Sequence, residues 1–101
     1  MVLDKIRLVF SNEEIERLQI EQSEHQLSIK VDVHGLKCCE ARRFINNLIN
    51  LLRMTFQLII IHGYNHGTAI KDMLKNNFSN SHVMGIYPDC YNQGVTHLLV
   101  A

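Results

Sequence analysis

The sequence lacks most of the features that would mark a membrane, fibrous or disordered protein. Its 101 residues include no tryptophan, one proline and five glycines, while 47% of them are hydrophobic. This composition excludes a disordered or collagen-like chain and predicts a core built mainly from aliphatic side chains. The longest aliphatic run, residues 58–61, is far shorter than the roughly 18 residues that a membrane span requires.

Cysteine is also scarce. The three cysteines, Cys38, Cys39 and Cys90, are odd in number and form no C-x-x-C pair. Such a set favours reduced thiols over a disulfide framework or a structural zinc site. The first five residues do not have the basic-then-apolar order of a signal peptide. We therefore expect a cytoplasmic protein that does not enter a membrane and whose length fits one domain.

Charge of one sign does not dominate the chain, because its formal net charge is zero. The charges are nevertheless unevenly distributed. Residues 1–27 hold three basic and six acidic side chains, whereas residues 28–101 hold seven basic and four acidic ones. This asymmetry predicts an acidic N-terminal extension over 1–27, followed by a mildly basic domain over 28–101.

Hydrophobic periodicity predicts an α/β fold. A strand-helix-strand step makes two successive strands parallel through a right-handed crossover. The chain should therefore form a single small two-layer α/β sandwich with a mixed sheet in the order βαβαββ, preceded by an N-terminal strand and an acidic helix. The expected strands are 6–10, 27–34, 56–61, 82–87 and 95–100, and the expected helices run from a capping box at Ser11 to about Glu21, from 37 to 52, and from 69 to 77.

Both parallel strands end in a histidine followed by a glycine, His34-Gly35 and His62-Gly63. Because ligands bind beyond the carboxyl ends of parallel strands, we expect these residues at one edge of the sheet. Asp32 precedes His34 by two residues and projects to the same face, where a carboxylate can fix the imidazole tautomer and raise its basicity. Polar residues that face solvent or cap the next helix would give the same pattern.

The segment 62–68, His-Gly-Tyr-Asn-His-Gly-Thr, joins a strand to a helix. Its glycines let the backbone approach an anion, and the helix start offers free N–H groups for phosphate. The segment is not a P-loop, because no G-K-[ST] follows. An ordinary turn capped by Thr68 or Asn65 is the alternative. Tyr64 could stack on a base, and nearby cations could contact phosphates. The candidate nucleic-acid-binding residues are Gly35, Gly63, Tyr64, Asn65, Gly67, Thr68, Lys71, Arg42, Arg43 and Lys75.

Together these stretches resemble the small MutS-related (Smr) domain family. Residues 31–35, Val-Asp-Val-His-Gly, are similar to the family's L-D-L-H-G motif. Residues 60–67 resemble its H-G-x-G-x-G loop, and 94–96 its G-A-T element. The chain departs from the pattern at the second loop glycine, replaced by Asn65 or His66, and at an arginine represented by Lys71. The resemblance covers residues 28–101 and implies a sandwich like the C-terminal domain of bacterial translation initiation factor three.

The resemblance also implies nucleic-acid binding and, in some members, endonuclease activity on DNA or RNA. The family's acid-and-histidine motif carries over to Asp32 and His34, and its glycine-rich loop to residues 62–67. For RNA, His34 would take the 2′-hydroxyl proton while His62 or His66 protonates the leaving oxygen, and no metal is then required. For DNA a water must attack, and Mg²⁺ or Mn²⁺ at Asp32 is expected.

Two alternatives to a nuclease stay open at this stage. A non-catalytic module would hold a nucleic-acid backbone, on a ribosome for example, through loop amides at 63–68; zero net charge then implies weak, salt-sensitive binding. A protein-interaction domain would instead use the acidic N-terminal helix. Among the other histidines, His25 and His82 are expected to be structural. His97 is expected close to the site if the last strand packs beside the first of the two parallel strands, and burial of His97 is the alternative.

Overall fold

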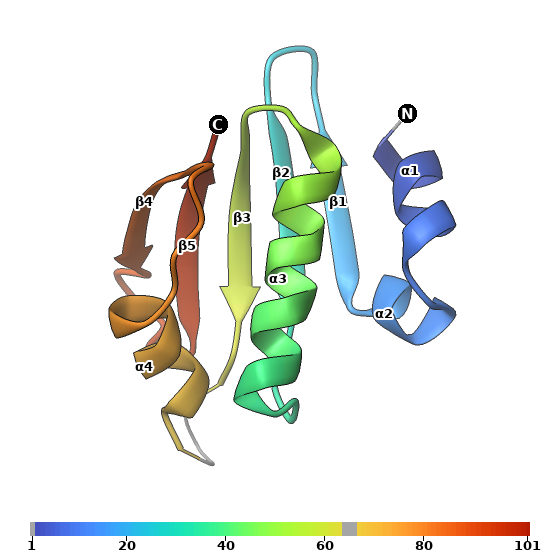
Figure 1. The fold of residues 1–101 in the computed structure, drawn as a ribbon. Helices are drawn as coiled ribbons and strands as arrows, with labels where there is room; N and C mark the ends of the chain where they lie inside the picture. The colour runs from blue at the N-terminus through green and yellow to red at the C-terminus, as the bar shows by residue number, and fades with distance from the viewer. Residues whose placement is uncertain (1, 64–66) are drawn as a thin grey trace.

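A computed structural model describes residues 2–63 and 67–101 (Figure 1). The strands form one mixed sheet in the order β1-β2-β3-β5-β4. In its centre, β2 (Leu27–Asp32) and β3 (Phe56–Ile61) are parallel, and β5 (Val95–Val100) runs antiparallel to β3. The edges are β1 (Leu18–Gln22), antiparallel to β2, and β4 (Val83–Pro88), antiparallel to β5. The predicted mixed sheet is therefore confirmed.

The helices form the second layer (Figure 1). After β2, α3 (Cys38–Leu52) crosses over the sheet to β3, and after β3, α4 (Ala69–Asn76) leads toward β4. At the N-terminus, α1 (Val2–Val9) packs beside α3, and the short α2 (Asn12–Glu16) leads into β1.

The strands supply the apolar face that the helices cover. In β2, Leu27, Ile29 and Val31 are buried, while the alternate residues are half-buried. In β3, Phe56, Leu58 and Ile60 are buried in the same alternation. This period of two places one set of side chains in the core and the other on the opposite face of the sheet. The predicted two-layer α/β sandwich is confirmed.

The first residues differ from the prediction. Residues 6–10, predicted as a strand, belong mostly to helix α1. Ile6 and Phe10 lie one helical turn apart and are buried, and the Phe10 ring lies 5.3 Å from that of Phe44 on α3. Between them Leu8 is 87% exposed. The strand prediction was wrong because an exposed leucine conceals the helical period of the buried residues.

The second helix begins where the capping box predicts but ends early. Ser11 Oγ accepts a bond from the Glu14 N–H at 3.2 Å, and the Glu14 carboxylate accepts one from the Ser11 N–H at 2.9 Å. The prediction that the helix continues to about Glu21 was wrong, because β1 begins at Leu18. Leu18 and Ile20 pack against the core while the residues after each are exposed. Pairing with the edge of β2 therefore overrides the helical spacing read from the sequence.

The N-terminal segment thus shares the core of the rest of the chain, since α1 packs on α3 and β1 extends the sheet. A boundary between an extension at 1–27 and a domain at 28–101 stays a prediction. No helix in residues 2–63 and 67–101 is long and apolar enough to cross a membrane.

Candidate functional site

A cleft of about 600 Å³ opens where β2 and β3 end. Because these strands are parallel, their carboxyl ends and the first turns of α3 and α4 meet at one edge of the sheet. The Cys38 Sγ lies 3.3 Å from the Ala69 carbonyl oxygen and links the two helix starts. The predicted site residues that line this cleft are His34, Gly35, His62, Gly63, Gly67 and Lys71.

Asp32 and His34 form the expected pair. An Asp32 carboxylate oxygen accepts a bond from the His34 backbone N–H at 3.1 Å and contacts the ring nitrogen Nδ1. Val31 and Val33 are buried on the opposite side, so the strand alternation directs the pair away from the core. With Nδ1–H donated to the carboxylate, Nε2 is the basic nitrogen of the neutral ring. The His34 side chain is 68% exposed, so a ligand can reach it.

Arg17 holds the same segment from the side of β1. Its guanidinium donates to the Asp32 carbonyl oxygen at 3.0 Å and to the His34 carbonyl oxygen at 3.3 Å. Its own carbonyl oxygen accepts a bond from the Asp32 N–H at 2.9 Å. The N-terminal segment therefore contributes to the geometry of the Asp-x-His motif. Sequence reasoning missed this residue, because no local spacing connects Arg17 with a motif 15 residues further on.

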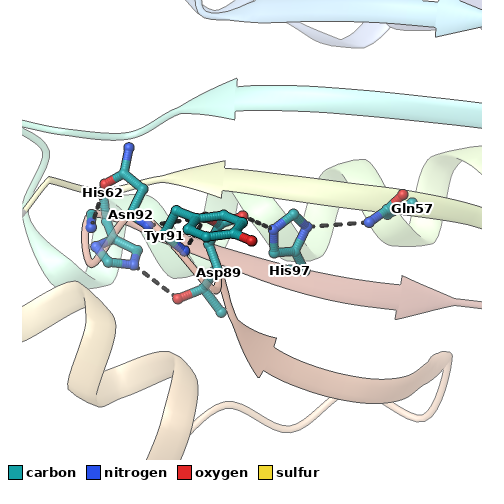
Figure 2. A network of polar contacts seen from close by, with 8 residues as sticks. Gln57, His62, Asp89, Tyr91, Asn92 and His97 are labelled. Carbon is teal, nitrogen blue, oxygen red and sulfur yellow. Dashed lines mark hydrogen bonds and ion pairs between the residues drawn. The ribbon is translucent and has the colours of Figure 1, made fainter.

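His62 occupies a different environment from His34. Its side chain points into the protein and the residue is only 7% exposed. The Nδ1–H donates to the Gly63 carbonyl oxygen at 2.8 Å, and Nε2 accepts from the Thr96 hydroxyl at 2.8 Å (Figure 2). Burial lowers the pKa of His62; the Gly63 carbonyl acts against this shift, and the charge of Lys71 adds to it. His62 is therefore neutral at pH 7 with both ring nitrogens engaged.

The loop between β4 and β5, residues 89–94, closes over the His62-Gly63 backbone. The Gly94 carbonyl oxygen accepts bonds from the His62 N–H at 2.9 Å and from the Gly63 N–H at 3.1 Å. A Cβ at position 94 would lie 3.1 Å from the Gly63 Cα. This close approach of two backbones is the physical reason for a glycine at the start of the G-A-T-like element.

Asp89 organises that loop (Figure 2). Its carboxylate accepts a bond from His97 Nε2–H at 2.7 Å and from the N–H groups of Tyr91 and Asn92 at 3.0 Å each. The bond from His97, followed by the backbone bonds, holds the pKa of Asp89 below its usual range. On the other side of the His97 ring, Gln57 donates to Nδ1 at 3.2 Å.

His97 therefore anchors the loop. Its strand, β5, lies beside β3 and not beside β2, which carries Asp32. The last strand therefore does not pack beside the strand that carries Asp32, which was the arrangement expected to bring His97 close to the site. The other two histidines lie on the periphery: His25 is exposed near Glu24, and His82 contacts Ala101 at the start of β4.

The predicted cations are distributed over two helices. Lys71, on the first turn of α4, lines the cleft. Lys71 and Lys75 also border a second hollow, of about 360 Å³, together with Tyr87 and Thr96. Arg42 and Arg43 are exposed on α3. The structure thus places Lys71 at the cleft, whereas Arg42, Arg43 and Lys75 do not line it.

The loop that precedes α4 is described in part. Gly63 and Gly67 have positive φ angles of 73° and 114°, which favour glycine. Thr68 stands at the N-cap position, but its hydroxyl donates to the Asp72 carboxylate at 2.9 Å and makes no bond to the helix backbone. The predicted residues Tyr64, Asn65 and His66 lie outside the described residues.

Within the described residues, Asp32 is not part of a preformed metal site. Its carboxylate is engaged with His34, and the described residues bring together no group of three or more His, Cys, Asp or Glu side chains that could hold a metal ion. Mg²⁺ or Mn²⁺ for DNA cleavage stays a prediction.

Comparison with known proteins bears on the fold. No protein-family model and no curated protein matches the sequence. Among solved structures, the chain is similar to the Smr domain of Thermus thermophilus MutS2, with a TM-score of 0.56 and 22% sequence identity; the match covers 71% of this chain and 96% of that one. This likeness supports the predicted architecture over most of the chain. The chain has the fold of an Smr domain.

Proposed function

We propose that this chain is a nucleic-acid-binding domain of the Smr type that cleaves RNA, with Asp32 and His34 as its acid–base pair. The observation that carries the proposal is their placement: an exposed, carboxylate-bound histidine opens on the same cleft as a glycine loop, a helix N-terminus and a lysine. An acid–base group and a phosphate-binding surface at one strand edge are the parts that phosphodiester chemistry requires.

A phosphate group would bind where β3 leads into α4. The first turn of α4 offers backbone N–H groups and the positive end of the helix dipole. Gly63 lines the cleft at φ 73°, and the absence of a side chain lets a ligand approach its backbone. Lys71 adds a positive charge, although a lysine does not make the bidentate contact of an arginine. Asp72 on the same turn is bonded to the Thr68 hydroxyl.

His34 would act on the RNA itself. Its Nε2 takes the proton of a 2′-hydroxyl, and the freed oxygen attacks the adjacent phosphorus. The new bond joins O2′ to phosphorus, while the bond from phosphorus to O5′ breaks. The products are a 2′,3′-cyclic phosphate and a 5′-hydroxyl end. Asp32 orients the ring and stabilises the imidazolium that forms.

His62 is the other predicted general acid, and its two ring nitrogens are held by Gly63 and Thr96. Both its nitrogens are bonded, so donation of a proton to the leaving oxygen would require breaking the bond to Gly63 or changing the protonation of a buried ring. The leaving oxygen then takes its proton from His66 or from water. Cleavage by a His66→Ala variant distinguishes these two sources.

The test is a cleavage assay with labelled single-stranded RNA, structured RNA and supercoiled DNA, each with EDTA and with Mg²⁺ or Mn²⁺. Asp32→Asn and His34→Ala should each lower the rate of RNA cleavage by about 10²–10⁴-fold while RNA binding is retained. The matched control is His25→Ala, because His25 is exposed in the turn before β2, at the opposite end of this strand from Asp32. RNA cleavage that continues unchanged in His34→Ala would overturn the assignment.

A non-catalytic binding module, acting on a ribosome for example, is the second candidate. The engagement of both His62 ring nitrogens, which leaves this residue unavailable for proton transfer, favours it. The zero net charge of the chain implies that such binding is weak and salt-sensitive. If the protein cleaves none of the substrates but binds nucleic acid at low salt, and if Lys71→Gln weakens this binding, the domain is a binding module and not a nuclease. A protein-interaction role for the acidic N-terminal segment stays a further prediction.

A further inference from the structure

Tyr91 is a feature of the β4–β5 loop that the proposed function does not use. Its side chain is 99% exposed. Aromatic rings usually bury most of their surface in a core or an interface. Full exposure beside a candidate site therefore points to a ligand that covers the ring.

The turn that carries Tyr91 is held in place by several bonds. The Asp89 carboxylate accepts from the Tyr91 and Asn92 N–H groups and, at its other oxygen, from His97 (Figure 2). The Asn92 side-chain oxygen accepts from the Gly94 N–H at 2.8 Å. A ring on such a preorganised backbone loses less freedom when it binds than one on a mobile segment.

The same turn is joined to the cleft. Gly94, three residues after Tyr91, bonds to the backbone of His62 and Gly63, and Gly63 lines the cleft. A chain whose phosphate lies against Gly63 therefore has a neighbouring nucleotide within reach of the β4–β5 loop. The ionised Asp89 carboxylate under the turn repels phosphate, so the uncharged face of a base is the part of a nucleotide that fits there.

We propose that Tyr91 is a stacking platform for an unpaired nucleobase of the nucleic acid held in the cleft. The inference rests on the proposed function and deepens it, because it names single-stranded substrate. Both faces of a base inside a duplex are already stacked, whereas an unpaired base can lie on an aromatic ring. Stacking of this kind accepts any base and occurs with RNA and with DNA.

The experiment measures binding by fluorescence anisotropy at low salt, with the same short sequence as single-stranded RNA, single-stranded DNA and duplex. His34→Ala is present in every protein, so that no substrate is cleaved. Tyr91→Ala should weaken single-strand binding by about 5–100-fold, the range of one lost stacking contact, and leave duplex binding within about twofold. Tyr91→Phe keeps the ring and should bind like the parent. Gln93→Ala, an exposed change in the same loop, is the matched control.

A second readout reports on the ring itself. The sequence has three tyrosines and no tryptophan, so its emission comes from tyrosine alone. Binding of a single strand should quench the tyrosine fluorescence of the parent. The quenching should be smaller in Tyr91→Phe, which keeps its affinity but lacks the phenol. Single-strand binding that survives Tyr91→Ala, or an equal loss on duplex, overturns this inference alone. Absence of binding by the parent to every nucleic acid overturns the proposed function and this inference with it.

Discussion

Thr96→Val removes the hydroxyl that donates to the buried nitrogen of His62. The two side chains come from β5 and from the end of β3, and both residues are buried, at 5% and 7% exposure. In the variant the imidazole keeps its bond to the Gly63 carbonyl and loses the partner of Nε2. Because both residues are almost fully buried, the acceptor nitrogen of His62 stays without a donor.

The expected cost follows from that acceptor. A buried polar atom left without its partner costs about 1–3 kcal/mol, and the extra methyl group of valine offsets a part of this by burial. We therefore expect a loss of about 1–2 kcal/mol in the free energy of unfolding. At roughly 2.1 cal/mol/K of unfolding entropy per residue, a chain of this length loses about 5 °C in Tm for each kcal/mol. Thr96→Val should then lower Tm by about 5–10 °C.

The assay is thermal and urea unfolding at pH 8, where His62 is neutral because burial lowers its pKa. Thr68→Val is the matched control, because the Thr68 hydroxyl bonds an exposed carboxylate and the same change there should cost less than about 0.5 kcal/mol. NMR of the His62 ring should show a proton on Nδ1 in both proteins and an altered Nε2 shift in the variant. Equal stabilities of Thr96→Val and Thr68→Val would refute the assigned bond.

Three further predictions concern pH and backbone. Burial holds the pKa of His62 in the folded protein below the value of about 6.5 for an unfolded histidine, so the unfolded chain binds the proton first. The free energy of unfolding should therefore fall as the pH drops below about 6.5. Urea titrations from pH 8 to 5 should show this fall, and the contribution of His62 to it should be absent from His62→Asn. Ser11→Ala breaks the capping box with Glu14 and should cost about 1 kcal/mol, with no measurable loss counting against the cap. Gly63→Ala places a Cβ on a backbone with a φ angle of 73° and should lower the free energy of unfolding by about 1–3 kcal/mol, measured by thermal unfolding. A variant as stable as the parent would contradict the expected backbone strain at this position.

Much of the fold follows from local periodicity in the sequence. The alternation predicted over 27–34 and the apolar run over 56–61 correspond to β2, which ends at Asp32, and to β3. The helical spacing predicted over 37–52 corresponds to α3. These segments bury a whole face or stripe, so their apolar period is visible without any knowledge of neighbours. The two His-Gly pairs that follow these strands lie at one edge of the sheet, because β2 and β3 are parallel and their carboxyl ends are therefore adjacent.

The N-terminal segment could not be predicted in the same way. Around residues 6–10 apolar side chains are both buried and exposed, so the sequence does not reveal that α1 turns only one stripe toward Phe44 on α3. Residues 18–22 carry a pattern compatible with a helix or a strand. They become β1 because the edge of β2 offers backbone partners to them, and this edge exists only in the assembled sheet.

The sequence by itself determined that His34-Gly35 and His62-Gly63 reach the cleft edge, and tertiary structure decided what each histidine can do there. His34 is the second residue after β2 and His62 the first after β3, with Asp32 in register with Ile61. His34 is exposed on a carboxylate, whereas His62 is buried between Gly63 and Thr96. Asp32 and Gly63 are local partners of the two rings. Other bonds come from residues far away in the chain: Thr96 is 34 positions from His62, and Arg17, which bonds the His34 carbonyl, is 17 positions from His34. An imidazole's tautomer, basicity and access depend on its neighbours in space, and only folding determines those neighbours.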